Sequence, residues 1–395
     1  MNIVLFNKFI VHKIRLVNLM KIYLQPKYVS DFQCDGKICP KNCCKRNWKI
    51  SIDAETYKKY LRVESPEHEL TRHIVKNDEE YFIQQIDGAC PFLNSGGLCS
   101  IQLERGEENI SQICRSYPRQ LYKFGGLIER SLTLTCPLAA NLVLNPNRRI
   151  EFETKEIILP DWAQRQIFVN EPNVSEKILP YAVEIQLTAI SILQEKRLSI
   201  DGRLIVLGFY LRQVEEIFLR RDLETISTLN KIYTSEEFFV GQMPLLISSV
   251  TFQQKEFLTL MSNVISKIRD GAAEKFLRQI DFNVSDKVRK KFLKKYAQTL
   301  ENYLVNEFFG GAYPFKIEGT IQHNYAVFSV NYKIVEAMAL SMFNRPVRKI
   351  FEMISELAVD LNHNENFLAA ITDEVKNFAD IAILMNKLFR GKNFE

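Results

Sequence analysis

The half of the chain that follows residue 175 is dominated by hydrophobic residues at helical spacing. Apolar positions recur three, four and seven residues apart, which is the pattern of a helix that packs against a core. Three segments show it most clearly: 178–196, 329–344 and 347–363. In the first of them the apolar face comprises Ile185, Ala189, Ile192 and Leu193. The pattern predicts an α-helical domain over residues 175–395.

Residues 20–145 carry shorter periodic stretches that are interrupted by turns. Asp53 is placed to cap a helix that begins at Ala54. Residues 94–102 predict a tight turn followed by a strand or loop, and residues 124–136 predict a turn that leads into a strand. We therefore expect an irregular N-terminal domain with little strand, in a protein that is mainly α.

Three further segments carry distinct signals. Residues 146–174 contain three prolines and several asparagines, which predict a linker with at most one short helix around Asp161–Phe168. Residues 286–296 hold six Lys and Arg side chains on an amphipathic pattern. This pattern indicates a solvated helix face, with an acidic partner or an anionic membrane as the alternatives. Residues 309–325 interrupt the helices with glycines and aromatics, and we expect a loop that lines a pocket.

Composition and charge restrict the function classes. Hydrophobic residues make up 46% of the chain and charged residues 25%, as in ordinary soluble domains. The net charge of +5 is too small to indicate a nucleic-acid partner. No run of eighteen apolar residues is present, so no transmembrane helix is expected.

The first nineteen residues are basic, and Lys8, Lys13 and Arg15 interrupt any apolar stretch that a signal peptide would need. Two interpretations stay open for residues 1–19. They form a basic amphipathic extension that lies on an anionic membrane, or they precede the true start of the folded chain near Met20. The expected location is the cytoplasm, with peripheral attachment to the inner face of the membrane as the added possibility.

All eight cysteines lie between residues 34 and 136. Disulfide-stapled domains are usually short and exported, so thiolates that bind metal are the better interpretation. The sequence contains no C-x2-C pair, which disfavours a zinc ribbon and leaves zinc as the alternative metal. An iron–sulfur cluster accepts more varied spacing. Cys136 follows an apolar run, and it is either a ligand or a small buried side chain.

The cysteine blocks carry a family resemblance. The pattern C-x4-C-x3-C-C-x3-W begins at Cys34, and it is followed by C-P-F-L at Cys90 and by C-x14-C-R-x-Y-P-R at Cys99. This order resembles the flagellin lysine-N-methylases and a wider group of cysteine-rich zinc- or iron-chelating proteins. The resemblance implies methyl transfer from S-adenosylmethionine to lysine side chains of flagellin, dependent on an iron–sulfur cluster of the 4Fe–4S type. The ligand candidates that it implies are Cys34, Cys39, Cys43, Cys44, Cys90, Cys99 and Cys114.

The residues themselves support methyl transfer only in part. No G-x-G loop follows a strand, so a doubly wound methyltransferase fold is not expected. The C-x3-C-x2-C spacing of radical S-adenosylmethionine enzymes is also absent. Candidate catalytic residues are Arg115, Tyr117 and His323, with His363 as a second proton acceptor. Candidate cofactor-binding residues are Arg119 and Trp48, through a carboxylate contact and ring stacking.

Each of these side chains also has an ordinary structural interpretation, such as core packing or an internal ion pair. The competing function is that of a non-enzymatic iron- or zinc-binding protein, a metal chaperone or a redox sensor. The sequence gives no indication of the oligomeric state.

Overall fold

A computed structural model describes residues 22–39, 41–46, 48–62, 70–77, 80–125, 127–156, 172–238, 250–252, 285–376 and 389–391. The expected N-terminal extension, residues 1–19, and the expected short helix at Asp161–Phe168 lie outside these residues. None of the described helices is long and apolar enough to cross a membrane.

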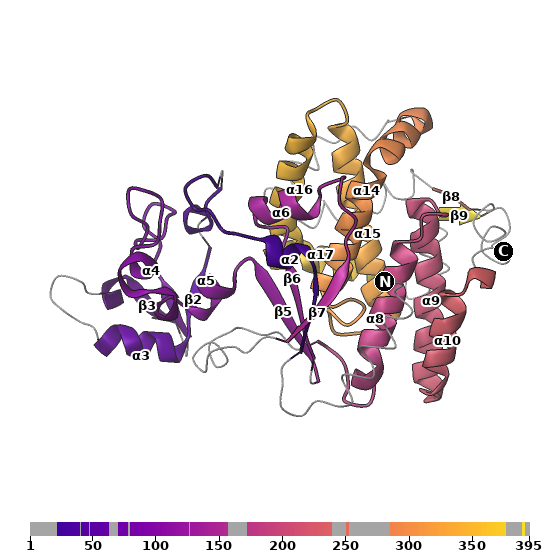
Figure 1. The fold of residues 1–395 in the computed structure, drawn as a ribbon, viewed down its shortest axis with the longest axis horizontal. Helices are drawn as coiled ribbons and strands as arrows, with labels where there is room; N and C mark the ends of the chain where they lie inside the picture. Colours follow the sequence, from indigo (N-terminus) through magenta and orange to yellow (C-terminus); the bar gives the residue numbers. More distant parts are fainter. Residues whose placement is uncertain are drawn as a thin grey trace.

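The C-terminal part is helical, which confirms the predicted fold class (Figure 1). Its helices are α8 (Leu179–Leu193), α9 (Ile200–Arg220), α10 (Thr225–Tyr233), α14 (Asp286–Gly310), α15 (Ile321–Ser341), α16 (Val347–His363) and α17 (Glu365–Lys376). Two short strands, β8 (Val250–Phe252) and β9 (Phe389–Gly391), pair antiparallel beside them. The apolar face predicted on the first segment is buried in α8, where all four residues are fully covered.

A four-stranded sheet packs against these helices, with the strand order β5-β6-β1-β7. Its strands are β1 (Ile22–Pro26), β5 (Arg119–Phe124), β6 (Leu127–Leu132) and β7 (Phe152–Glu156). Strand β1 is parallel to β6 and antiparallel to β7. Short helices α2 (Tyr28–Asp31) and α6 (Pro137–Val143) flank it. Strand β7 falls within the range expected to be a linker, so this part of the linker is a strand.

The rest of the N-terminal region forms a small cysteine-rich module at the left of Figure 1. Its strands β2 (Ile50–Ile52), β3 (Ile74–Asn77) and β4 (Glu80–Ile83) form an antiparallel sheet. Its helices are α3 (Ala54–Arg62), α4 (Ser100–Arg105) and α5 (Gln112–Ser116). Single 3-10 turns complete it: η1 (Cys43–Lys45), η2 (Leu70–His73) and η3 (Glu107–Asn109).

Two local predictions about this module had different outcomes. The Asp53 cap is confirmed, because Asp53 Oδ1 accepts a hydrogen bond from the Thr56 amide at 2.9 Å at the start of α3. The strand or loop predicted after residues 94–97 is wrong at Ser100, where α4 begins. Gly97, at φ +78°, makes the tight reversal, and Cys99 is then the residue before the first helical turn.

Two hydrophobic cores divide the described residues at a different place from the expected boundary at residue 145. The small core lies inside the cysteine-rich module and includes Ile52, Tyr60 and Phe92. The large core joins the four-stranded sheet to the helices, so strands β1 and β6 belong with the helical part. The cysteine-rich module therefore extends from the sheet and is covered on one side by the helical part.

Candidate metal centre

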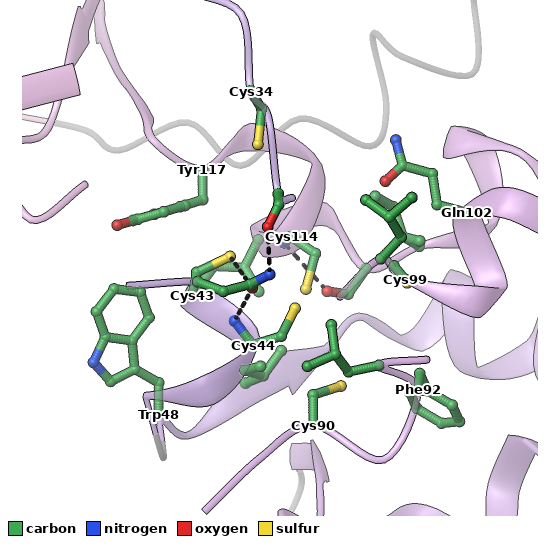
Figure 2. A pocket seen from close by; sticks show the side chains of 18 of the residues that line it. Cys34, Cys43, Cys44, Trp48, Cys90, Phe92, Cys99, Gln102, Cys114 and Tyr117 are labelled. Atoms are coloured by element: carbon green, nitrogen blue, oxygen red, sulfur yellow. Dashed lines mark hydrogen bonds between the residues drawn. The ribbon is translucent and has the colours of Figure 1, made fainter. Parts of the chain in front are cut away.

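All eight cysteines of the chain line a single cavity of about 760 Å³. The cavity lies between the cysteine-rich module and helices α6 and α16, and each thiol is free. An ion pair between Lys41 and Glu356 links the loop before η1 to α16 across this space. Figure 2 shows the sulfur atoms of Cys43, Cys44 and Cys114 directed toward one another. Residues that are 100 positions apart in sequence thus share one thiol-rich site.

A short turn built on Asn42 positions the adjacent thiols Cys43 and Cys44. The Asn42 Oδ1 atom accepts a hydrogen bond from the Cys44 amide at 3.0 Å, which starts the 3-10 turn. Its Nδ2 atom donates to the Gly97 carbonyl at 2.9 Å and to the Gly36 carbonyl at 3.3 Å. One amide side chain therefore joins the first cysteine loop to the loop that precedes Cys99.

The later cysteines are held by backbone contacts and by helix starts. The Cys90 amide donates to the Cys44 carbonyl at 2.7 Å, which fixes these two residues together. Cys99 directly precedes the first turn of α4. Cys114 lies in the first turn of α5, where its amide donates to Ser111 Oγ at 3.3 Å. Amide groups at helix starts favour a thiolate, but burial outweighs them here and raises the pKa of both Cys99 and Cys114.

The thiols differ in their readiness to ionise. A hydrogen bond from the Cys44 thiol lowers the pKa of Cys43 to about 7, with the charge of Arg46 acting in the same direction. The same donor lowers the pKa of Cys90, and it raises the pKa of Cys44 itself. Burial raises the pKa of Cys114 to about 12. Cys44 has one thiol hydrogen, so it favours the thiolate of Cys43 or that of Cys90, and not both at once.

Electrostatic contacts sort the eight thiols into two groups. We call the inner thiols Cys43 and Cys90 together with the three thiols whose pKa responds to both of them: Cys44, Cys99 and Cys114. The outer thiols are Cys34, Cys39 and Cys136, since the pKa of Cys136, raised to about 11 by burial, also responds to Cys34 and Cys39. Cys34 connects the two groups, because its pKa responds to Cys43 as well as to Cys39. Cys136 packs in the large core, whereas Cys44, Cys90 and Cys99 pack in or against the small core.

The described residues contain no group of three or more His, Cys, Asp or Glu side chains with the geometry of a ready single-ion site. The thiols are instead distributed along the wall of the cavity. Thiolates are soft ligands that select zinc, copper(I) or iron–sulfur clusters. The donor set fits a thiolate-bound metal centre. A cluster of several metal ions can reach thiols that are farther apart than the ligands of a single ion.

Three rings lie on the cavity wall together. The Trp48 ring is 5.3 Å from the Tyr117 ring at an angle of 73°, and it is 6.0 Å from the His363 ring. All three residues line the cavity, although they come from the loop after η1, the end of α5 and the end of α16. The structure therefore brings together three residues that the sequence analysis named: Trp48, Tyr117 and His363.

The other predicted residues lie elsewhere. Arg119 is in β5, with its guanidinium carbon 5.4 Å from the centre of the Phe32 ring. The His323 amide donates to Thr320 Oγ1 at the start of α15. Neither Arg119 nor His323 is among the described residues that line the cavity.

Arg115 has a structural position. Its side chain is buried and donates to the backbone carbonyls of Glu107 at 3.1 Å and Ile110 at 2.8 Å. Burial lowers the pKa of its guanidinium. These contacts hold η3 against the start of α5, so Arg115 supports the helix that carries Cys114.

Replacing Arg115 with alanine is expected to destabilise the cysteine-rich module by about 2 kcal/mol, because hydrogen bonds from a charged donor are lost. Urea unfolding of the variant and the wild-type protein measures this difference. Arg62→Ala, at an exposed position at the end of α3, is the matched control and should change stability by less than about 0.5 kcal/mol. An Arg115→Ala protein that is fully stable but inactive would instead place Arg115 in catalysis.

The sequence interpretation missed Arg46. Its guanidinium carbon is 5.2 Å from the centre of the Trp48 ring, and its charge acts on Cys43. The buried Nε and Nη2 atoms find no hydrogen-bond acceptor among the described residues. These two atoms form one edge of the guanidinium, which is the edge that binds a carboxylate in a bidentate manner. No feature of the sequence distinguished Arg46 from the basic residues around it.

Comparison with known proteins gives two family matches. The FliB lysine N-methylase C-terminal domain matches residues 186–386, half of the chain. The "Putative zinc- or iron-chelating domain" matches residues 33–137. These ranges correspond to the helical part and to the cysteine-rich region up to α6.

Individual relatives agree with these matches. Proteins named Lysine-N-methylase from Salmonella typhimurium strain LT2 and Salmonella choleraesuis strain SC-B67 are 26% identical over 221 residues, 53% of this chain and 52% of each relative. The Flagellar biosynthetic protein FliU of Salmonella muenchen is 32% identical over 129 residues, 31% of this chain and 76% of that protein. No solved structure matches the chain.

The fold and the cavity define a two-part protein in which a cysteine-rich module of the zinc- or iron-chelating type is joined to a helical domain. The chain belongs to the FliB lysine N-methylase family. The similarity spans about half the length of the lysine-N-methylases that it matches.

Proposed function

We propose that this protein transfers methyl groups from S-adenosylmethionine to the ε-amino groups of lysine side chains, and that the reaction depends on an iron–sulfur centre in the thiol-lined cavity. One observation carries the proposal: a chain of the lysine N-methylase family directs all eight of its cysteines into one cavity. A cavity of this size lies in the range of small-molecule sites, so it has room for a cofactor beside the centre.

The inner thiols would hold the centre. They supply five soft donors, and a cluster of the 4Fe–4S type needs four. The fifth donor, one of the adjacent pair Cys43 and Cys44, would remain as a hydrogen-bonding neighbour. When bound, the centre supplies a Lewis-acidic or redox-active site beside the methyl donor. Zinc is the alternative metal for the same donors.

Arg46 is not among the residues that line the cavity, but its neighbours Cys43, Cys44 and Trp48 are, and it would bind the carboxylate of S-adenosylmethionine at this edge of the cavity. Its Nε and Nη2 atoms have no acceptor among the described residues, and a bidentate carboxylate would satisfy both. This assignment replaces the role expected for Arg119, whose guanidinium lies over Phe32. It would place the cofactor next to Cys43 and Trp48.

Flagellin is the proposed methyl acceptor. The support is the name of the FliU relative, which refers to flagellar biosynthesis, and the FliB family name. Lysines of flagellin would be methylated in the cytoplasm before export. Peripheral membrane attachment through residues 1–19 remains a separate proposal, and nucleic acid is not proposed as a partner.

The test is incubation of the anaerobically prepared protein with S-adenosylmethionine and unassembled flagellin, followed by mass spectrometry. We expect lysine-containing flagellin peptides to gain mass in steps of one methylene group, and only when both the protein and S-adenosylmethionine are present. A protein that retains its metal but methylates neither flagellin nor any other protein lysine would favour the metal-chaperone or redox-sensor function instead.

A further inference from the structure

Trp48, Tyr117 and His363 form a ring cluster that lines the cavity but supplies none of the proposed metal ligands. The three rings meet at Trp48, with centroids 5.3 Å and 6.0 Å away, and they line the same cavity as the thiols. Figure 2 shows Trp48 and Tyr117 side by side next to Cys43. Flat apolar rings of this kind form the walls against which a long alkyl side chain packs.

His363 is the proton acceptor of this cluster. Burial and the neighbouring charge of Lys316 lower the pKa of His363, so its imidazole is neutral near pH 7. Lys316 lies close because its Nζ atom donates to Asn362 Oδ1 at 3.0 Å, one residue before His363. A neutral imidazole offers one nitrogen lone pair, which is what a base at an ammonium group needs.

The apolar rings favour an uncharged amine over an ammonium ion. Lys316 lies beside His363 and acts in the same direction. An apolar wall and a neighbouring cation both lower the pKa of a lysine that enters there. Such a site shifts a bound lysine toward its nucleophilic form.

We propose that Trp48, Tyr117 and His363 form the slot that receives the target lysine, and that His363 takes the proton from its ammonium group. This inference rests on the proposed methyltransferase function. The four-carbon stem of the lysine would lie along the cavity-facing surfaces of the Trp48 and Tyr117 rings, which contact each other edge to face. His363 would act at the end of the stem, which makes it a catalytic residue contributed by the helical part of the chain.

The proton step balances as follows. An N–H bond of the lysine ammonium breaks, and the proton moves to the unprotonated ring nitrogen of His363. The lone pair left on the amine forms a bond to the methyl carbon of S-adenosylmethionine. The bond between that carbon and sulfur breaks, and its electron pair stays on sulfur to give S-adenosylhomocysteine. His363 then releases the proton to water.

This assignment differs from the adenine-stacking role expected for Trp48. The Arg46 guanidinium already lies over the Trp48 ring, so an adenine would have to displace it. The slot lies between the inner thiols and α16, and this position gives His363 access to a side chain that enters from outside.

The first test is the methyl-transfer rate of His363→Gln with flagellin and S-adenosylmethionine. We expect the rate to fall at least about 100-fold, the smallest contribution typical of a general base. His323→Gln is the matched control, since it removes an imidazole that does not line the cavity, and it should keep the wild-type rate. Added imidazole should partly restore His363→Ala, which a merely structural defect would not allow.

The second test measures binding without turnover. The probe is Nα-acetyl-lysine methylamide, with Nα-acetyl-norleucine methylamide as the control that lacks the amine. Trp162→Phe leaves Trp48 as the single tryptophan, so its fluorescence reports binding to the metal-loaded protein. We expect a saturable change with the lysine probe, roughly tenfold weaker affinity for Tyr117→Leu, and unchanged affinity for S-adenosylmethionine.

The outcomes separate this inference from the proposed function. If wild-type protein methylates flagellin and His363→Gln is equally fast, the slot assignment is wrong and the methyltransferase function stands. If the lysine probe causes no change in Trp48 fluorescence, the slot is refuted whether or not methylation occurs. If the Tyr117→Leu protein loses S-adenosylmethionine binding instead, the rings bind the cofactor and not the lysine.

Discussion

Replacing Cys90 with serine is expected to abolish the metal centre, and with it the visible absorption and the methyl transfer. Cys90 is a buried inner thiol whose pKa is lowered by the neighbouring Cys44 thiol. A serine hydroxyl is a harder and far less acidic donor than a thiol, and it replaces a thiolate poorly as an iron ligand. The iron content of anaerobically prepared protein and its visible spectrum measure the effect.

Cys136→Ser is the matched control for this experiment. Cys136 lines the same cavity, but it belongs to the outer thiols and packs in the large core. We expect this variant to retain the iron content and the spectrum of the wild type. Equal loss of iron in both variants would contradict the division into inner and outer thiols, and full retention in Cys90→Ser would contradict the site itself.

The second large effect is expected at a buried ion network in the helical part. Asp201, at the start of α9, binds Lys333 at 2.5 Å and Arg289 at 2.9 Å. Glu336 binds the same two cations at 2.9 Å and 2.5 Å, and Lys333 is only 1% exposed. Two carboxylates thus balance two cations that join α9, α14 and α15.

Asp201→Asn is expected to destabilise the protein by about 3 to 5 kcal/mol, because it leaves two buried cations with one carboxylate between them. Urea unfolding of the metal-free protein measures the difference. Glu216→Gln removes a charge of the same kind from an exposed pair with Arg212 on the same helix, and it should cost less than about 1 kcal/mol. Equal stability of the two variants would show that the network contributes nothing beyond a surface pair.

The same network makes the stability of the folded protein depend on pH in the acid range. Burial alone would raise the pKa of Asp201, but Lys333 and Arg289 outweigh it and lower the pKa to about 2 from the ordinary 3.8. A carboxyl whose pKa is lowered by folding stabilises the folded state above pH 3.8, and this contribution is lost as the pH falls toward 2. The wild type should therefore lose about 2 kcal/mol more than Asp201→Asn over this range.

The helical part could be predicted from sequence because its signal is local. The segments 178–196, 329–344 and 347–363 became α8, α15 and α16, since apolar residues at helical spacing need only one neighbouring surface to pack against. The four-stranded sheet could not be predicted in the same way. Strand β1 pairs with β6, about one hundred residues later, and no local pattern reports such a pairing.

The basic segment 286–296 shows why charge alone misleads. It was expected to be a solvated helix face, but Arg289 points inward to Asp201 and Glu336. The partners lie on α9 and α15, so the sequence of α14 contains nothing that marks this arginine as different from its neighbours.

The candidate site could be predicted as a set of cysteines but not as an arrangement. Spacing suggested that the first four thiols act together, whereas the structure joins Cys43 and Cys44 to the later Cys90 and leaves Cys34 in contact with both groups. The side chain of Asn42 is the physical reason, because it ties the first loop to Gly97.

The roles of the arginines are equally hidden in the sequence. Arg115 stands beside Cys114 and yet binds backbone carbonyls. Arg46 carries no motif and yet has two buried donors without an acceptor among the described residues. The position next to Cys114 therefore did not identify the arginine whose guanidinium has donors available for a ligand, which is Arg46.

The most direct test of the central claim is anomalous X-ray diffraction from crystals of anaerobically prepared protein, measured at the iron and zinc absorption edges. The inner thiols are predicted to surround an anomalous signal that increases across the iron edge and does not increase across the zinc edge. Zinc as the sole metal, or an iron signal located away from Cys43, Cys44 and Cys90, would contradict the assignment of the cavity as an iron–sulfur centre.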